Sequence, residues 1–326
     1  MTTTSLRIFC DAPLIPSALE ILKQGTSAHE LVFPRRAAES VLVRAEPDPA
    51  LATAEIAFGQ PDVEGVFNAE SLRWVHLTSA GYTRYDTPEF RSFARLRGLL
   101  VSNSSAVYAE ACAEHALAFM LAQARKLPQG LRTRCANGSP PWAELREGSV
   151  LLQDQRAVIL GFGAIAARLV ELLAPFGMEV IAMRRKPRGD EGIPVVTPEN
   201  LQQAFASADH VISILPDNAE SIRFISSERL GWMKPGAIFY NIGRGTTVDQ
   251  EALLESLRSG RLGAAWLDVT DPEPLPDDHP FWGAPNCYIT PHTAGGHQNE
   301  SETLVGHFLK NLDRYLGGLP LNDRII

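Results

Sequence analysis

Residues 156–166, Arg-Ala-Val-Ile-Leu-Gly-Phe-Gly-Ala-Ile-Ala, decide the fold of this chain of 326 residues. The run 158–160 is typical of a short buried strand, and the apolar spacing over 164–176 predicts a helix directly after it. Gly161 and Gly163 stand between the two, where they permit a tight turn and a close approach of the backbone to a pyrophosphate. The N-terminus of a helix favours such an anion. The stretch therefore predicts the first strand–turn–helix unit of a dinucleotide-binding domain.

This motif has a second interpretation when it is taken alone. A Gly-x-Gly turn between any buried strand and helix has the same letters. Ala166 also replaces the third glycine of the motif, a change that such sites tolerate. A strand predicted at 179–183 follows at the distance expected in a βαβ unit, and this context favours the dinucleotide interpretation.

The residues after that second strand bear on the choice of cofactor. An NAD site usually places Asp or Glu there, to accept a hydrogen bond from the ribose 2′-hydroxyl. Here the chain has Arg184, Arg185 and Lys186, and no acid occurs until Asp190. Cations where an anion is expected suit a 2′-phosphate, so we expect NADP in preference to NAD. The alternative is a solvated basic turn with no ligand.

The composition limits the classes of protein. Hydrophobic residues make up 45% of the chain, which is enough for two packed domains. A net charge of −8 and a pI of about 5.5 argue against nucleic acid as a partner. Four scattered cysteines predict reduced thiols in a cytoplasmic protein and no metal site. The polar start and the lack of a long apolar run predict neither a signal peptide nor a membrane partner.

Strand-like and helical segments alternate along the chain. In the first hundred residues we predict strands at 6–9, 41–44, 56–58, 74–77 and 99–102, and helices at 17–22, 68–72 and 87–95. A long helix at 106–125 and a loose arm at 126–155 follow. We then predict strands at 157–160, 179–183, 210–214, 237–241, 264–268 and 287–290, and helices at 164–176, 198–206, 226–231, 249–259 and 301–316. This rhythm predicts an α/β fold with parallel sheets that helices cover on both faces.

Three short segments in the last third of the chain each carry one reactive side chain. Arg244 lies in Asn-Ile-Gly-Arg-Gly, Glu273 in Asp-Pro-Glu-Pro-Leu, and His292 in Thr-Pro-His-Thr-Ala-Gly. A guanidinium binds a carboxylate through two parallel hydrogen bonds, and an imidazole transfers protons near neutral pH. A carboxylate beside the imidazole favours its protonated form. The set predicts an enzyme that binds an anionic 2-oxo acid and protonates its carbonyl oxygen.

The order and spacing of these segments resemble the D-isomer-specific 2-hydroxyacid dehydrogenase family, and in particular its glyoxylate and hydroxypyruvate reductases. The resemblance extends over nearly the whole chain and is strongest over 103–125, the glycine turn and the three catalytic segments. It implies two Rossmann-like domains, with the cofactor domain inserted into the substrate domain and the active site in the cleft. The implied bounds are 1–102 and 294–326 for the substrate-binding domain and 103–293 for the dinucleotide-binding domain.

The resemblance also implies a role for each matched residue. Arg244 would bind the substrate carboxylate, together with the backbone N–H groups of a turn after the strand at 74–77. His292 would donate a proton to the carbonyl oxygen as hydride arrives from the nicotinamide, and Glu273 would keep His292 protonated. The residues of the substrate-binding turn are Ser79, Ala80 and Gly81.

The cofactor residues follow from the same resemblance. Asp268 would hold the nicotinamide end, the residues after the glycine turn would meet the pyrophosphate, and the Leu-Pro pair after the strand at 210–214 would flank the adenosine. The full implied set is Gly161, Gly163, Ala164, Ile165, Arg184, Arg185, Leu215, Pro216, Ile242, Gly243, Asp268, His292 and Ala294.

The leading functional hypothesis is NADPH-dependent reduction of a small 2-oxo acid, such as glyoxylate or hydroxypyruvate, to the D-2-hydroxy acid. The alternative is a dinucleotide-sensing, corepressor-like binding protein of the same fold. We also expect a homodimer, because the helix at 106–125 and the arm at 126–155, which contains Trp142, have more apolar surface than a connector needs.

Overall fold

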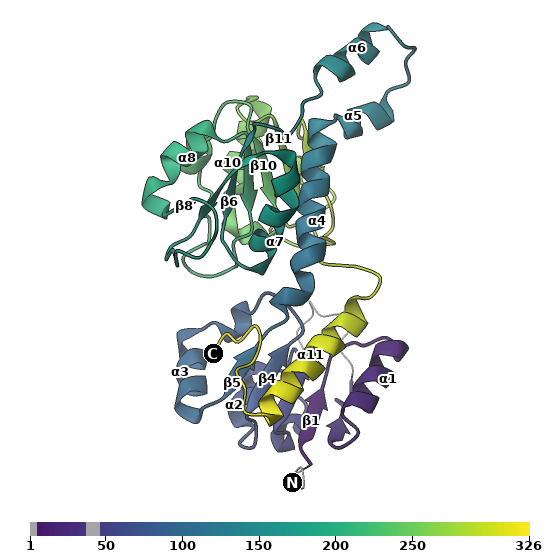
Figure 1. Ribbon diagram of the computed structural model, residues 1–326, viewed down its shortest axis with the longest axis vertical. Helices are drawn as coiled ribbons and strands as arrows, with labels where there is room; N and C mark the ends of the chain where they lie inside the picture. The colour runs from purple at the N-terminus through teal and green to yellow at the C-terminus, as the bar shows by residue number, and fades with distance from the viewer. Residues whose placement is uncertain (1–4, 37–45) are drawn as a thin grey trace. The chain divides into compact units, whose positions relative to one another are not determined.

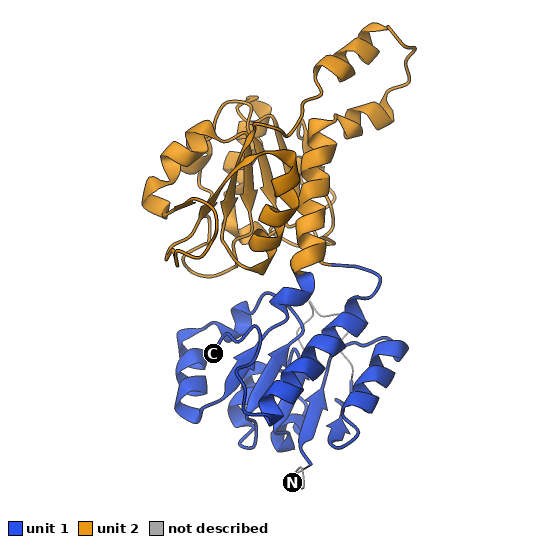
Figure 2. Ribbon diagram, viewed as in Figure 1, with its two compact units in different colours: residues 1–108, 296–326 blue, residues 109–295 orange. Residues whose placement is uncertain are grey.

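The computed structural model describes residues 5–36 and 46–326, and it divides the chain into two compact units (Figures 1 and 2). Unit 1 consists of Met1–Tyr108 and Gly296–Ile326, and unit 2 consists of Ala109–Gly295. Unit 2 is therefore inserted into unit 1. The chain passes from one unit to the other within helix α4 (Ser105–Ala124) and again after Gly295.

Unit 1 is built on a sheet of five parallel strands in the order β2-β1-β3-β4-β5. The central strands are buried on both faces, and their sequences are accordingly apolar runs rather than alternating patterns. The strand order reverses between β1 and β3, which is where doubly wound folds bind ligands. The strands are β1 (Arg7–Cys10), β2 (Glu30–Val32), β3 (Ile56–Gly59), β4 (Trp74–Leu77) and β5 (Leu100–Ser102).

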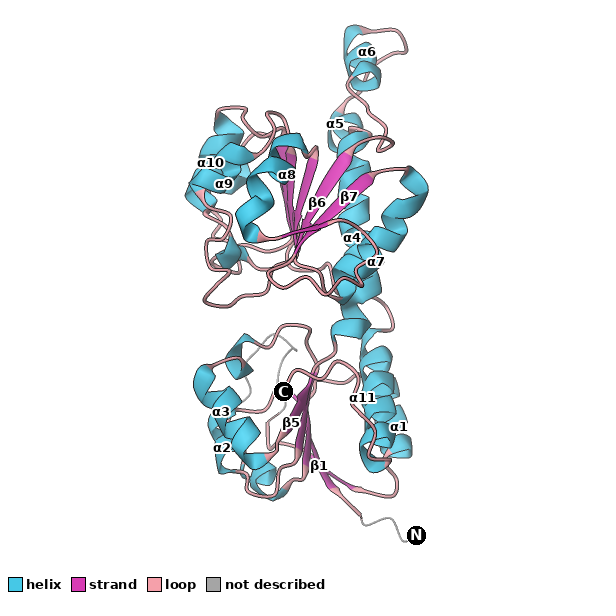
Figure 3. Ribbon diagram, turned by 60° about the vertical axis from the view of Figure 1, so that its left-hand side comes forward, coloured by secondary structure: helices cyan, strands magenta, loops and turns pink. Residues whose placement is uncertain are grey.

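Helices cover both faces of this sheet. Figure 3 shows α2 (Val63–Asn68) and α3 (Pro88–Arg97) on one face, with α1 (Pro16–Gly25) and α11 (Glu300–Leu316) on the other. The last helix belongs to this unit because its apolar side completes the core. Phe308 stacks on Phe58, with 4.4 Å between the ring centroids, and on Trp74 at 5.4 Å.

Unit 2 is built on seven parallel strands in the order β12-β11-β10-β9-β6-β7-β8. The order reverses between β6 and β9, as in a doubly wound dinucleotide domain, so the predicted fold class is confirmed. The two-residue strand β8 escaped prediction because it is too short to show a period. The strands are β6 (Arg156–Leu160), β7 (Glu179–Met183), β8 (Val195–Val196), β9 (His210–Ser213), β10 (Ile238–Asn241), β11 (Ala264–Leu267) and β12 (Cys287–Ile289).

The helices of unit 2 form two layers around its sheet. Figure 3 shows α4 and α7 (Ala164–Leu173) on one face, and α8 (Leu201–Ser207), α9 (Ser227–Trp232) and α10 (Gln250–Arg258) on the other. Phe205, Phe239 and Phe281 are fully buried beneath the second layer. Because all seven strands are parallel, their carboxyl ends lie at one edge of the sheet.

The arm after α4 contains two short helices, where the sequence predicted a loose segment. They are α5 (Leu127–Arg132) and α6 (Pro140–Glu147), and they project away from the sheet of unit 2 (Figure 1). Each has a proline in its first turn, where the missing N–H costs no helical hydrogen bond. Across the described residues, no helix has both the length and the apolar character that crossing a membrane requires.

The helices and strands of unit 1 differ from the prediction at α2 and at β2. The helix predicted at 68–72 is wrong, because the helix there is α2, which ends at Asn68. The start signal was Asp62, whose carboxylate accepts a hydrogen bond from the N–H of Gly65. Strand β2 was not predicted, and the strand predicted at 41–44 lies outside the described residues.

Candidate active site

The glycine turn after β6 leaves the start of α7 open. Gly161 has a φ of +91°, a conformation that favours glycine, and its N–H donates to the carbonyl of Met183 at 3.0 Å. Gly163 is the N-cap of α7, and no side chain of the described chain caps it. A Cβ on Gly163 would meet no heavy atom within 4 Å. The first N–H groups of α7 can therefore receive a pyrophosphate, so the turn fits a dinucleotide.

Further predicted cofactor residues lie at the same edge of the sheet. Leu215 and Pro216 follow β9, and Ile242 and Gly243 follow β10. A Cβ on Gly243 would lie 2.6 Å from the carbonyl oxygen of Leu215, so the two loops pack closely only because the residue is glycine. The N–H of Ile242 donates to the carbonyl of Ser213 at 3.1 Å. The topology of unit 2 thus gathers these residues next to the reversal of strand order.

The basic segment after β7 has a carboxylate partner that the sequence analysis missed. Nη1 of Arg184 donates to Oε1 of Glu191 at 3.1 Å, and the side chain of Glu191 is only 3% exposed. The same carboxylate accepts the N–H groups of Arg188 at 2.7 Å and Gly189 at 2.8 Å. The hydrogen bond from Arg188 is the main cause that lowers the pKa of Glu191, against the effect of its desolvation. Glu191 therefore closes this segment into a compact loop.

Arg185 differs from Arg184 in its surroundings. Its side chain is 52% exposed and forms an ion pair with Glu220. Lys186 beside it is exposed as well. Both arginines therefore have acidic partners. The sequence did not indicate these pairs, because the folding of the loops brings Glu191 and Glu220 to the arginines. Arg185 is the more accessible of the two cations.

The loop that carries Arg244 is fixed by its neighbours. Asn241, at the end of β10, donates through Nδ2 to the carbonyl of Arg244 at 3.0 Å, and Thr247 Oγ1 donates to the same carbonyl at 2.6 Å. The following residue, Gly245, must be glycine, because a Cβ there would overlap the carbonyl group of Thr270. This close approach joins the Arg244 loop to the loop that carries Glu273.

Glu273 and His292 form a hydrogen-bonded pair. Nδ1 of His292 lies 3.0 Å from Oε2 of Glu273, and Oε1 of Glu273 accepts the N–H of Thr270 at 3.1 Å. A carboxylate can only accept, so Nδ1 carries the shared proton and Nε2 is left for a ligand. Partial burial would raise the pKa of Glu273, but the hydrogen bond from His292, that from Thr270 and the charge of Arg244 together lower it. The three predicted catalytic side chains are thus electrostatically linked.

Asp268 holds the loop that carries His292. Its side chain is 1% exposed. Oδ1 accepts hydrogen bonds from Thr290 Oγ1 at 2.6 Å and from the N–H of Thr293 at 2.9 Å, while Oδ2 accepts the N–H of Ala294 at 3.0 Å. Its backbone carbonyl also accepts the N–H of His292 at 2.8 Å. Most of the hydrogen-bonding capacity of Asp268 therefore serves the protein itself, a role that the sequence analysis did not assign to it.

In unit 1, the turn after β4 presents free backbone donors. The carbonyl of Ser79 accepts the N–H of Ser104 at 3.1 Å, that of Ala80 accepts Asn103 Nδ2 at 2.7 Å, and that of Gly81 accepts Ser79 Oγ at 2.5 Å. The N–H groups of Ala80 and Gly81 have no acceptor among the described residues. Successive unpaired N–H groups make an anion-binding site. The turn can therefore bind a carboxylate.

Comparison with known proteins agrees with this chemistry. The model of the D-isomer specific 2-hydroxyacid dehydrogenase, NAD binding domain, matches residues 117–294. A glyoxylate reductase of Aeropyrum pernix is 31% identical over 324 residues, which cover 96% of this chain and 93% of the relative. The glyoxylate reductase/hydroxypyruvate reductase of Homo sapiens is 31% identical over 261 residues, which cover 78% of this chain and 77% of the relative.

The solved structures give the same result. A D-isomer specific 2-hydroxyacid dehydrogenase from Xanthobacter autotrophicus Py2, in complex with NADPH and MES, is 25% identical to this chain. It superimposes with a TM-score of 0.77 and covers 99% of this chain and 98% of its own. None of the relatives named here favours the alternative of a corepressor-like binding protein. The chain therefore belongs to the D-isomer specific 2-hydroxyacid dehydrogenase family and is an NAD(P)-dependent oxidoreductase.

Proposed function

We propose that this enzyme reduces a small 2-oxo acid, such as glyoxylate or hydroxypyruvate, to the D-2-hydroxy acid. The observation that carries the proposal is the pair of Glu273 and His292, with 3.0 Å between Oε2 and Nδ1. A proton held on Nδ1 by the carboxylate leaves Nε2 of the imidazolium as the donor to the carbonyl oxygen. The names of the relatives, which are glyoxylate and hydroxypyruvate reductases, support this class of substrate.

Each remaining group has a role in this reaction. Within unit 2, the guanidinium of Arg244 is suited to bind the substrate carboxylate. Within unit 1, the N–H groups of Ala80 and Gly81 are suited to bind a carboxylate. Asp268 fixes the loop of His292 and retains a lone pair on Oδ2 for the nicotinamide amide. NADPH, when bound, supplies the hydride.

The test of the proposed function is an NADPH-oxidation assay with a panel of 2-oxo acids of increasing side-chain size. Turnover of at least one of them at rates well above the uncatalysed background is the expected result. A purified protein that binds NADPH but reduces no member of the panel would contradict the proposal.

The cofactor that we propose is NADP. The open start of α7 suits the pyrophosphate that NAD and NADP share, so the choice rests on the loop after β7. The side chain of Arg185 is half exposed and can exchange its ion pair with Glu220 for one with a 2′-phosphate. Arg184 lies in the same loop, where Glu191 holds its guanidinium in place. Glu191 in this loop is buried and already accepts hydrogen bonds from Arg184, Arg188 and Gly189, so it is not available to the 2′-hydroxyl of NAD. The NADPH complex of the Xanthobacter relative supports the proposal.

We expect the double variant Arg184→Ala, Arg185→Ala to lose at least about tenfold in kcat/KM with NADPH. One charge-assisted hydrogen bond contributes roughly 1.5–3 kcal/mol, and 1.4 kcal/mol corresponds to a factor of ten. The exposure of Arg185 places its own contribution at the lower end of this range. Steady-state kinetics with both cofactors measure the effect, and kcat/KM with NADH should change little.

The control for this experiment is Arg258→Ala. Arg258 is an exposed arginine in the last turn of α10 and not part of the loop after β7, so its removal takes one positive charge from the surface without altering that loop. Its kinetics should match those of the parent with both cofactors. Equal use of NADH and NADPH by the parent, or an NADPH preference that survives in the double variant, would contradict the NADP assignment.

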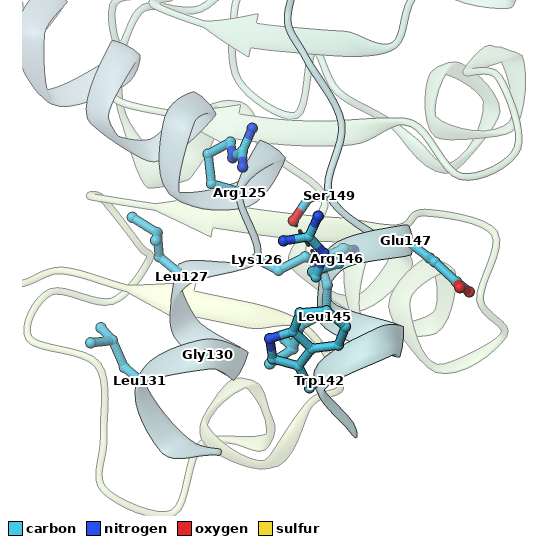
Figure 4. A pocket seen from close by; sticks show the side chains of 10 residues that line it. All are labelled: Arg125, Lys126, Leu127, Gly130, Leu131, Trp142, Leu145, Arg146, Glu147 and Ser149. Carbon is cyan, nitrogen blue, oxygen red and sulfur yellow. Dashed lines mark hydrogen bonds between the residues drawn. The ribbon is translucent and has the colours of Figure 1, made fainter. Parts of the chain in front are cut away.

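We also propose that the arm of unit 2 forms a homodimer. Helices α5 and α6 enclose a hollow of about 580 Å³ that includes Leu127, Leu131 and Trp142 (Figure 4). Leu131 is 87% exposed and Leu151 is 65% exposed. Large apolar side chains that gather on a projecting arm are costly in water, and a second copy of the arm would cover them.

We expect sedimentation at micromolar concentration to show a dimer that Leu131→Glu converts to a monomer, because a carboxylate in an apolar interface loses its hydration. The matched control is Leu96→Glu, since Leu96 on α3 is also 87% exposed but belongs to unit 1. This control should remain dimeric. A monomeric parent would show that the arm does not associate with a second copy.

A further inference from the structure

A chain of hydrogen bonds crosses the carboxyl ends of three strands in unit 1. Asp11 follows β1, Gln60 follows β3, and Ser79 lies shortly after β4. Oδ1 of Asp11 accepts the N–H of Gln60 at 2.8 Å, and the N–H of Asp11 donates to the carbonyl of Phe58 at 3.2 Å. Gly59, with a φ of +143°, leaves space for the Asp11 carboxylate that any Cβ would occupy. The backbone of Gln60 is therefore fixed where the strand order of the sheet reverses.

The side chain of Gln60 reaches the substrate-binding turn. Gln60 is only 5% exposed, and its Nε2 donates to Ser79 Oγ at 2.8 Å. Ser79 Oγ in turn donates to the carbonyl of Gly81 at 2.5 Å. Because Ser79 has used its proton on Gly81, its oxygen must accept, and Gln60 must present its NH₂ group. A longer contact at 3.4 Å links the same NH₂ group to Thr78 Oγ1.

This relay determines which way the carbonyl of Gly81 faces. The hydroxyl of Ser79 holds the Gly81 carbonyl toward the turn itself. The N–H groups of Ala80 and Gly81, which have no acceptor in the described chain, lie in the peptide planes whose carbonyls accept from Ser104 and Asn103. If the hydroxyl were free to rotate, the carbonyl of Gly81 could turn outward, and an outward carbonyl repels a carboxylate. The bond from Gln60 removes that freedom, because it occupies a lone pair of Ser79 Oγ from the buried side.

We propose that Gln60 is a positioning residue for the substrate, which acts through Ser79 to keep the Gly81 carbonyl turned away from the carboxylate that the Ala80 and Gly81 N–H groups bind. This inference rests on the proposed function, since it assigns a role in binding the substrate of that reaction. The carboxylate of Asp11 supports this arrangement, because it accepts a hydrogen bond from the backbone N–H of Gln60. Burial raises the pKa of Asp11 to about 7, so its negative charge is partly neutralised near pH 7 and opposes a bound anion less.

The test is Gln60→Met, which keeps the length and volume of the side chain and removes its donor. We expect KM for the best 2-oxo acid of the panel to rise roughly five- to tenfold, the effect of one neutral hydrogen bond. The dissociation constant of oxalate, a carboxylate analogue of the substrate, should rise equally in calorimetry with NADPH present. The affinity for NADPH itself should not change, because the cofactor residues lie in unit 2. A merely structural role would lower the melting temperature without this selective loss.

Two further variants make the test decisive. Thr78→Val removes the longer contact of Gln60 and should leave KM unchanged. Ser79→Ala should raise KM as much as Gln60→Met does, and the double variant should be no worse than either, because both changes break one relay. If Gln60→Met does not fold, the KM and the oxalate affinity of Ser79→Ala test the relay without it.

The outcomes separate this inference from the proposed function. A parent enzyme that reduces no 2-oxo acid overturns the proposed function. An active parent whose KM and oxalate affinity are unchanged in Gln60→Met, or in Ser79→Ala, overturns the positioning role alone. Effects of the two variants that add in the double variant also overturn it, since independent contributions exclude a shared relay.

Discussion

Replacement of His292 is expected to lower kcat for 2-oxo acid reduction by roughly 10²–10⁴-fold, the usual contribution of a general acid. His292 has a φ of +52°, a region that Asn adopts more readily than Ala. His292→Asn is therefore the cleaner variant, because it keeps the backbone of the loop while removing the imidazole. The measurement is single-turnover reduction under saturating NADPH, which separates chemistry from binding.

Glu273→Gln is the matched comparison for His292. The amide keeps the size of the side chain but removes the charge that favours a protonated imidazole. The lowered pKa of Glu273 means that it stays ionised throughout the neutral range, so the pair is intact at assay pH. In the variant, the decline of the reduction rate with rising pH should begin at lower pH than in the parent.

For His292→Asn, a single-turnover rate close to that of the parent would remove His292 from the chemistry.

Replacement of Arg244 by alanine is expected to lower kcat/KM by roughly 10²–10⁴-fold. Two charge-assisted hydrogen bonds to a carboxylate contribute about 3–6 kcal/mol together, and each 1.4 kcal/mol is a factor of ten. The loss should appear in KM, because the carboxylate is bound more weakly, and in kcat, because the carbonyl is no longer oriented toward His292. Steady-state kinetics and oxalate binding measure the two parts.

Arg244→Lys is the control that separates charge from geometry. A lysine keeps the positive charge but cannot form two parallel hydrogen bonds, so it should recover only part of the loss. The backbone of the loop should remain in place in both variants, because Asn241 and Thr247 hold the carbonyl of residue 244 rather than its side chain. A kcat/KM in Arg244→Ala within a few-fold of the parent would contradict the carboxylate-binding role.

The elements that the sequence predicted well are those with strong local signals. The strand, glycine turn and helix at β6 and α7 depend on apolar spacing and on Gly161, all within one short stretch. The same holds for α4, a long run of residues with few helix breakers, and for α11, whose apolar residues recur on one side. Strands β2 and β8 and the arm helices were missed. Strand β8 has only two residues, and α5 and α6 lie in a segment whose glycines and prolines are typical of a loop.

The sequence by itself determined which reactive side chains the chain has and that a doubly wound sheet would present them from strand ends, because residue type and periodicity are local properties. Only the tertiary structure decided how those side chains are held. Asp268 on the loop of His292 and Gln60 on Ser79 are contacts between different loops, and Glu191 on Arg184 closes a single loop on itself. Their geometry depends on the order in which strands pair and on how loops pack at one edge of a sheet, and a hydrogen bond between residues separated along the chain leaves no periodic trace in the sequence.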